Sequence, residues 1–131
     1  MYGKRYKGGE DSFLVSANRR LIGVADGVGG WANRDVCSGV CAKFLCKAIC
    51  DLFNSENELS LHELLNQGVK ALQEARIEGS TTLCAAKLEP FTEGNQHPKP
   101  SSATIKVLNL GDSGCLIVRP HPSDLQKVYR T

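Results

Sequence analysis

Carboxylate side chains follow or open apolar runs at three places in this 131-residue chain. The run Leu21–Ala25 has the length and branching of a buried strand, and it ends on Asp26 with a glycine-rich turn directly behind it. Glu10 and Asp11 open a second strand-like run, and Asp112 stands in a glycine turn after a third. Acids at strand ends, beside backbone that can approach closely, supply the oxygen ligands that a hard divalent cation prefers. The spacing therefore predicts that the three segments converge on one metal site.

The elements that position these acids follow from hydrophobic periodicity. Apolar residues recur at helical spacing in two segments, and shorter apolar runs bounded by turn residues predict strands. Two of these strands flank the turn Gly111–Gly114, which predicts a hairpin. Strands, a helix pair and then more strands predict an α+β fold with the helices on one face of a mainly antiparallel sheet. The predicted order is strand 13–16, strand 20–25, helix 35–53, helix 61–77, strand 81–88, strand 103–110, strand 115–118 and a further strand from 127.

The second predicted helix carries signals at both ends. Ser60 and Glu63 have the spacing of a capping box, in which each residue pairs with the backbone of the other. Gly68 lies on the apolar face and would let a neighbouring element approach closely. Gly79 is predicted to end the helix, because glycine is favoured just past a helix C-terminus.

Four motifs, in this order, resemble those of the metal-dependent Ser/Thr protein phosphatases of type 2C, the PPM family. They are Glu10-Asp11, Val24–Gly30, Gly79–Thr82 and Asn109–Ser113. An Asp-Gly pair alone is typical of a turn, so Asp26 taken singly is interpreted as a turn acid. Asp112 taken singly is interpreted as an acid of the predicted hairpin turn Gly111–Gly114. Four motifs in family order favour metal ligation instead. The resemblance runs from about Gly8 to Arg119 and implies an α-β-β-α sandwich, in which two mainly antiparallel sheets are flanked by helix pairs.

The resemblance also implies a role for each acid. Asp26, the candidate catalytic residue, would bridge two Mg²⁺ or Mn²⁺ ions, and the carbonyl of Gly27 would bind one of them. Glu10 would contact the second ion through water, and Asp11 would lie beside the first. Asp112 would belong to a third, weaker ion. The ions would lower the pKa of a bridging water, which attacks phosphoserine or phosphothreonine directly.

Two features depart from the family pattern. Arg5 is the nearest candidate for a phosphate-binding arginine, but its offset from the acidic pair is unusual. Family domains are longer and carry further metal-binding aspartates in Asp-Gly and Asp-Asn motifs, whereas the acid after Asp112 here is Asp124, which matches neither. Residues 1–131 therefore resemble the N-terminal half of a phosphatase domain, expected to be inactive alone. The alternatives are a pseudophosphatase or truncated isoform that acts as a binding module, and an incomplete gene model.

Composition limits the remaining classes of function. The net charge of +2 gives no argument for binding to nucleic acid or membrane, and no apolar run reaches the length of a membrane span. The basic start is not followed by an apolar stretch, which argues against a secretory signal. The six cysteines are expected to be reduced and mostly buried. We therefore expect a cytoplasmic protein, or a mitochondrial or plastid one if a transit peptide precedes this chain, with self-association through exposed sheet edges.

Overall fold

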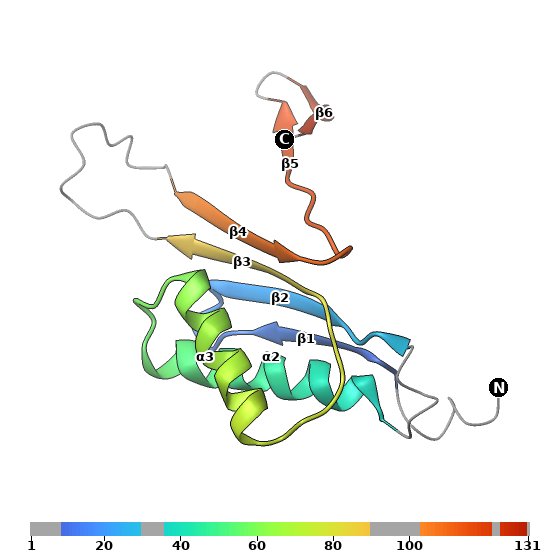
Figure 1. Cartoon of the computed structure of the whole chain (residues 1–131). Helices are drawn as coiled ribbons and strands as arrows, with labels where there is room; N and C mark the ends of the chain where they lie inside the picture. Colours follow the sequence, from blue (N-terminus) through green and yellow to red (C-terminus); the bar gives the residue numbers. More distant parts are fainter. Residues whose placement is uncertain (1–8, 30–35, 90–102, 122–123, 131) are drawn as a thin grey trace.

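The computed structural model describes residues 9–29, 36–89, 103–121 and 124–130. Four strands form one antiparallel sheet in the order β1-β2-β3-β4, and β5 pairs with β6 in a separate two-stranded sheet. The helices α2 and α3 pack together over one face of the four-stranded sheet (Figure 1). The predicted α+β fold is confirmed, whereas a sandwich of two sheets stays a prediction. The elements are β1 (Asp11–Val15), β2 (Leu21–Asp26), α2 (Ser38–Ser55), α3 (Leu61–Glu74), β3 (Leu83–Glu89), β4 (Thr104–Leu110), β5 (Val118–His121) and β6 (Asp124–Arg130).

The core lies between the helices and the covered face of the sheet. Buried residues of α2 recur every three or four positions, so they form one stripe that faces the strands. Burying an aliphatic side chain of this kind contributes about 1.5–3 kcal/mol. A register slip of one residue would turn Leu14 and Leu21 outward, so this core also fixes which residues meet at the strand ends. The cluster includes Leu14, Leu21, Ala25, Cys41, Ala42, Leu45, Cys46, Ile49, Phe53, Leu64, Leu83 and Ala85.

The start of α3 and its close approach to α2 are as predicted. Glu63 Oε2 accepts a hydrogen bond of 2.7 Å from the backbone N–H of Ser60. Ser60 Oγ in turn accepts one of 3.2 Å from the backbone N–H of Glu63, which completes the capping box. A Cβ on Gly68 would lie 2.9 Å from Leu45 Cδ1, so a larger residue there would push the two helices apart.

The predicted end of this helix is wrong. The last helical residue is Glu74, and Gly79 lies beyond the end of α3. Arg76 takes the left-handed conformation, with φ at 54°, and its N–H donates to the carbonyl of Gln73 at 3.1 Å. The next N–H along the chain donates to the carbonyl of Leu72, which completes a Schellman motif. The sequence did not indicate this stop because the position that favours glycine holds an arginine.

The predicted hairpin around Gly111–Gly114 is also wrong. β4 pairs with β3 along its whole length, whereas β5 starts at Val118 and pairs with β6, which begins at Asp124 rather than 127. The Ser113 hydroxyl lies 2.6 Å from that of Thr82, just before β3. The chain after the turn is therefore held against the start of β3 and does not run back along β4.

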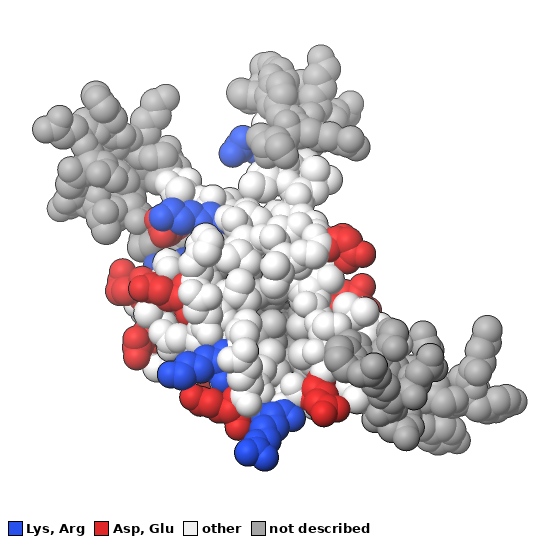
Figure 2. Space-filling view, in the orientation of Figure 1, with Lys and Arg blue, Asp and Glu red and all other residues white. Residues whose placement is uncertain are grey.

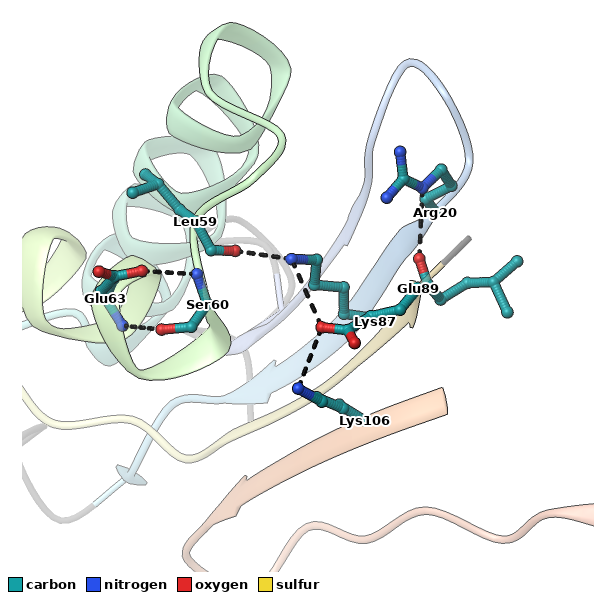
Figure 3. Close-up of polar contacts among 8 residues, drawn as sticks. Arg20, Leu59, Ser60, Glu63, Lys87, Glu89 and Lys106 are labelled. Atoms are coloured by element: carbon teal, nitrogen blue, oxygen red, sulfur yellow. Dashed lines mark hydrogen bonds and ion pairs between the residues drawn. The ribbon is translucent and has the colours of Figure 1, made fainter. Parts of the chain in front are cut away.

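Among the residues whose burial is described, one charged side chain, that of Lys87 in β3, is buried, with an exposed fraction of 4%. Its Nζ donates a hydrogen bond of 2.9 Å to the carbonyl of Leu59, in the connection between α2 and α3 (Figure 3). The same Nζ lies 3.9 Å from Glu89 Oε1 and 5.7 Å from the centre of the Phe53 ring. Lys106 of β4 also pairs with Glu89, at 3.2 Å. The contacts of Lys87 connect the helix pair to the end of the sheet at which β3 finishes.

All six cysteines are free thiols, in agreement with the expected reduced state. Burial raises the pKa of the Cys41, Cys46 and Cys84 thiols, which makes them poor nucleophiles at neutral pH. Cys37 and Cys50 are half-buried and Cys115 is exposed, so three of the six cysteines are fully buried where most were expected to be.

Candidate metal centre

Asp26 and Asp11 face each other at one end of the sheet. Asp26 is the last residue of β2, and the antiparallel register places it directly opposite Asp11, the first residue of β1. Both residues are exposed. The Asp11 carboxyl raises the pKa of Asp26, first by a hydrogen bond between the two side chains and then by its negative charge. Slight desolvation and the charges of Asp112 and Glu10 raise the pKa of Asp26 further. Asp11, Asp112 and Glu10 therefore all lie within electrostatic range of Asp26, and their convergence on one metal site stays a prediction.

Glu10 is held beside Asp26 by the backbone of the glycine turn. The N–H of Gly27 donates a hydrogen bond of 3.0 Å to the carbonyl of Glu10. A Cβ on Gly27 would lie 2.7 Å from that carbonyl oxygen and 2.7 Å from the carbonyl oxygen of Ser38. Ser38, the first residue of α2, also donates its hydroxyl to the carbonyl of Val28. Only glycine fits here, because the segment before β1, the turn after β2 and the start of α2 meet at this point.

Two threonines fix the backbone of Asp26. The N–H of Thr82 donates to the carbonyl of Asp26 at 2.9 Å, and the Thr81 hydroxyl donates to the same carbonyl at 3.1 Å. In the other direction, the N–H of Asp26 donates to Thr82 Oγ1 at 3.0 Å. Sequence reasoning included these threonines only as part of a family motif and did not predict their bonds to Asp26.

Asp112 lies in a turn that packs against the same threonine. Gly111 has a φ of 99°, which favours glycine, and a Cβ there would lie 2.8 Å from Thr82 Cγ2. On the other side of Asp112, the Ser113 hydroxyl contacts Thr82 Oγ1. The charge of Asp112 reaches Asp26 and contributes to its raised pKa. The turn is therefore part of the acidic end of the sheet although it belongs to no hairpin.

A depression of about 410 Å³ opens beside Asp11 and Asp26, on the sheet face away from the helices. In the view of Figure 2, acidic side chains of the described residues lie near the end of the sheet at which β2 and β4 finish. A negative concavity of this kind attracts cations. The depression is lined by Asp11, Ser12, Phe13, Val24, Ala25, Asp26 and Ser113.

The donor chemistry of this end fits a hard divalent cation. The acids supply only oxygen, and their mutual repulsion, seen in the raised pKa of Asp26, is what a cation would relieve. Across the described parts of the chain, no three His, Cys, Asp or Glu side chains are already grouped closely enough to hold a metal ion. The assignment of Glu10, Asp11, Asp26 and Asp112 as ligands, with the Gly27 carbonyl, stays a prediction. Arg5 lies outside the described residues.

Comparison with known proteins identifies several phosphatases. No protein-family model matches the chain. It is 35% identical over 129 residues to "Protein phosphatase PTC7 homolog fig" of Drosophila grimshawi, covering 90% of this chain and 38% of that protein. It is 31% identical over 116 residues to "Probable protein phosphatase 2C 80" of Arabidopsis thaliana, covering 88% and 25%. It is 28% identical over 135 residues to "Protein phosphatase 2C homolog 7, mitochondrial" of Saccharomyces cerevisiae, covering 94% and 36%.

A solved structure shares the fold. The photosystem II phosphatase PBCP aligns with a TM-score of 0.51 and 21% identity, covering 83% of this chain and 58% of that one. The chain thus spans well under half the length of the curated relatives above and more than half of the solved one. None of the helices in the described residues is both long and apolar enough to cross a membrane.

Proposed function

This chain belongs to the PP2C-type protein phosphatase family, and we propose that it forms the N-terminal part of a metal-dependent Ser/Thr phosphatase domain. The observation that carries the proposal is the pairing of Asp11 with Asp26, next to Glu10 and Asp112, at one end of the sheet. Like charges are gathered there, and none of the described Lys or Arg residues forms an ion pair with them, which is typical of a functional site rather than of a stabilising ion pair.

The residues of this chain have distinct tasks in the proposed site. Asp26 would contact both of two ions, with its backbone fixed by Thr81 and Thr82. Asp11, Glu10 and the carbonyl of Gly27 would complete this part of the ligand set. Mg²⁺ or Mn²⁺, when bound, supplies a water of lowered pKa and neutralises phosphate charge, which allows hydrolysis of phosphoserine or phosphothreonine.

Asp112 would hold a third ion more weakly, because it stands on a separate turn. We propose that the remaining ligands come from a C-terminal half of the domain, as the partial coverage of the relatives suggests. Residues 1–131 alone would then not turn over substrate. A non-catalytic binding module is the second candidate, and the absence of a complete ligand group among the described residues favours it.

The partners and the compartment are also proposals. The substrates would be intracellular phosphoproteins, and the yeast relative named as mitochondrial makes that organelle the alternative to the cytoplasm. Self-association is supported by the sheet face away from the helices, where large apolar side chains are exposed. Phe13 has an exposed fraction of 75%. The other exposed apolar residues on this face of the sheet are Val15, Ile22, Val24, Leu88, Ile105 and Val107.

Calorimetric titration with Mn²⁺ tests the metal site. We expect weak binding to the wild-type chain and none to Asp26→Asn, because this carboxylate is the one proposed to contact both ions. Asp51→Asn is the matched control, since Asp51 is an exposed acid of α2 that pairs with Lys47. Equal Mn²⁺ affinity in wild type and Asp26→Asn would overturn the assignment.

Activity with p-nitrophenyl phosphate and a phosphopeptide separates the two candidate functions. We expect no turnover above buffer by residues 1–131 with Mn²⁺, and turnover once the C-terminal half of a close relative is added. Restored activity that disappears in Asp26→Asn supports the phosphatase. Mixtures that stay inactive, although the chain binds the phosphopeptide, favour the binding module.

A further inference from the structure

Thr82 is bonded to Asp26 through both its backbone and its side chain. Its N–H donates to the carbonyl of Asp26 at 2.9 Å, and its Oγ1 accepts the N–H of Asp26 at 3.0 Å. Thr82 is buried, with an exposed fraction of 8%, so water competes weakly for these bonds. The end of β2 therefore cannot move independently of Thr82.

The side chain of Thr82 also contacts both neighbours of Asp112. Its Oγ1 lies 2.6 Å from Ser113 Oγ, and its Cγ2 would lie 2.8 Å from a Cβ on Gly111. The hydroxyl branch therefore holds the residue after Asp112, and the methyl branch packs against the residue before it. The turn that carries Asp112 thus packs against the side chain of Thr82.

A single hydroxyl can serve both segments at once. A threonine oxygen has one proton to donate and two lone pairs that accept. The N–H of Asp26 occupies one lone pair, which leaves the proton or the second lone pair for the Ser113 hydroxyl. Neither valine nor alanine could link the two segments in this way.

We propose that Thr82 is a positioning residue that sets the separation between Asp26 and Asp112, and thereby couples the cations held at these two acids. The inference rests on the proposed function and adds a residue to which no ligand role is assigned. Groups that orient metal ligands without touching the metal alter its affinity strongly, because ligand geometry must be held before the ion arrives.

Substitutions at Thr82 distinguish the contribution of its hydroxyl from that of its methyl group. Thr82→Val keeps the shape of the side chain and removes the hydroxyl, whereas Thr82→Ser keeps the hydroxyl and removes the methyl group. Thr104→Val is the matched control, because Thr104 is an exposed residue of β4. Ser113→Ala removes the far partner of the hydroxyl from a turn, where it leaves the core untouched, and it replaces Thr82→Val if that variant does not fold.

Mn²⁺ binding to the full chain, measured by calorimetry, is the first measurement. We expect Thr82→Val to weaken binding by about 10- to 100-fold. Ser113→Ala should weaken binding in the same direction, Thr82→Ser should retain most of the affinity, and Thr104→Val should match wild type. In the metal-free chain, amide exchange followed by NMR should show faster exchange of the Asp26 N–H in Thr82→Val but not in Thr82→Ser.

A double-mutant cycle distinguishes positioning from a general loss of stability. Asp112→Asn should weaken Mn²⁺ binding in the wild-type background and have little further effect in Thr82→Val, because the turn is no longer held at the site. Additive effects, or wild-type affinity in both Thr82→Val and Ser113→Ala while Asp26→Asn loses binding, would overturn this inference alone. A wild-type chain that binds no Mn²⁺ would overturn the proposed function and this inference with it.

Discussion

The two ends of the four-stranded sheet differ in how their charged side chains are paired. At the end where β3 finishes, Lys87 and Lys106 both pair with Glu89, and Lys87 also bonds a backbone carbonyl (Figure 3). At the other end, Asp11 and Asp26 face each other, and the nearby acids raise the pKa of Asp26 further. Among the described residues, Glu89 at the first end pairs with lysines, whereas the acids at the second end form no ion pair with a described Lys or Arg, and in the proposed site a bound cation would supply the opposite charge. The difference supports the proposal that the paired charges stabilise the fold and the unpaired acids bind a cation.

The largest expected effect on stability comes from removing Lys87 from the end of the sheet at which lysines pair with Glu89. Lys87→Met removes the charged donor to the Leu59 carbonyl and leaves this part-buried acceptor without its partner. We expect the free energy of unfolding to fall by about 2–3 kcal/mol, the upper range for a hydrogen bond to a charged group. Chemical denaturation of the full chain measures the change.

Lys106→Met is the control for this prediction. Lys106 pairs with the same glutamate but is exposed, and exposed ion pairs contribute about 0–1 kcal/mol. If the two substitutions destabilise the chain equally, burial of Lys87 is not what gives its contacts their strength.

A smaller effect on stability is expected from a substitution at the start of α3, near the same end of the sheet. Ser60→Ala removes the acceptor for the N–H of Glu63 at the start of α3 and should cost about 1 kcal/mol of unfolding free energy. The reciprocal bond from the Ser60 N–H, the larger cause, keeps the pKa of Glu63 below its usual value. Its stabilisation is therefore present above the unfolded pKa and lost as the pH falls through the folded pKa.

Thermal unfolding of Ser60→Ala near neutral pH tests the capping box. Ser55→Ala is the matched control, since Ser55 lies at the end of α2 and its hydroxyl donates within its own turn, to the carbonyl of Asp51. A loss in Ser55→Ala as large as that in Ser60→Ala would show that the capping box has no special role.

The sequence predicted what depends on local spacing. The stripe of α2 and the pair Ser60 and Glu63 recur at helical intervals, so they could be recognised without the fold. The place of the acids at strand ends predicts one metal site, which stays a prediction. The register then put Asp11 directly opposite Asp26, which no local pattern contains.

Contacts between distant residues could not be predicted in this way. Thr82 and Ser113 are 31 positions apart, and Lys87 and Leu59 are 28 apart, so their pairing depends on the finished sheet and helix pair. The turn after Gly111 resembled a hairpin locally, but its bond to Thr82 directs the chain elsewhere. Propensity and periodicity describe neighbours in sequence, whereas tertiary packing decides between the turns that they allow.

The smallest expected effect on stability comes from relieving the repulsion between Asp26 and its neighbouring acids, because these side chains are exposed to water. The folded state raises the pKa of Asp26, chiefly through Asp11, so the folded chain binds a proton more readily than the unfolded one. Without metal, wild-type stability should therefore rise as the pH falls through the folded pKa of Asp26 towards its unfolded value. Asp26→Asn removes the repulsion and should be slightly more stable than wild type at pH 7.

Thermal unfolding in EDTA between pH 7 and pH 4 measures this difference. The advantage of Asp26→Asn should shrink with falling pH, because protonation relieves the same repulsion in wild type. Asp51→Asn, which breaks an exposed ion pair with Lys47, should show no advantage at pH 7. With Mn²⁺ in place of EDTA the order should reverse, since the cation stabilises only the chain that binds it. An Asp26→Asn variant less stable than wild type in EDTA at pH 7 would mean that this carboxylate serves the fold, and that the two ends of the sheet do not differ as described.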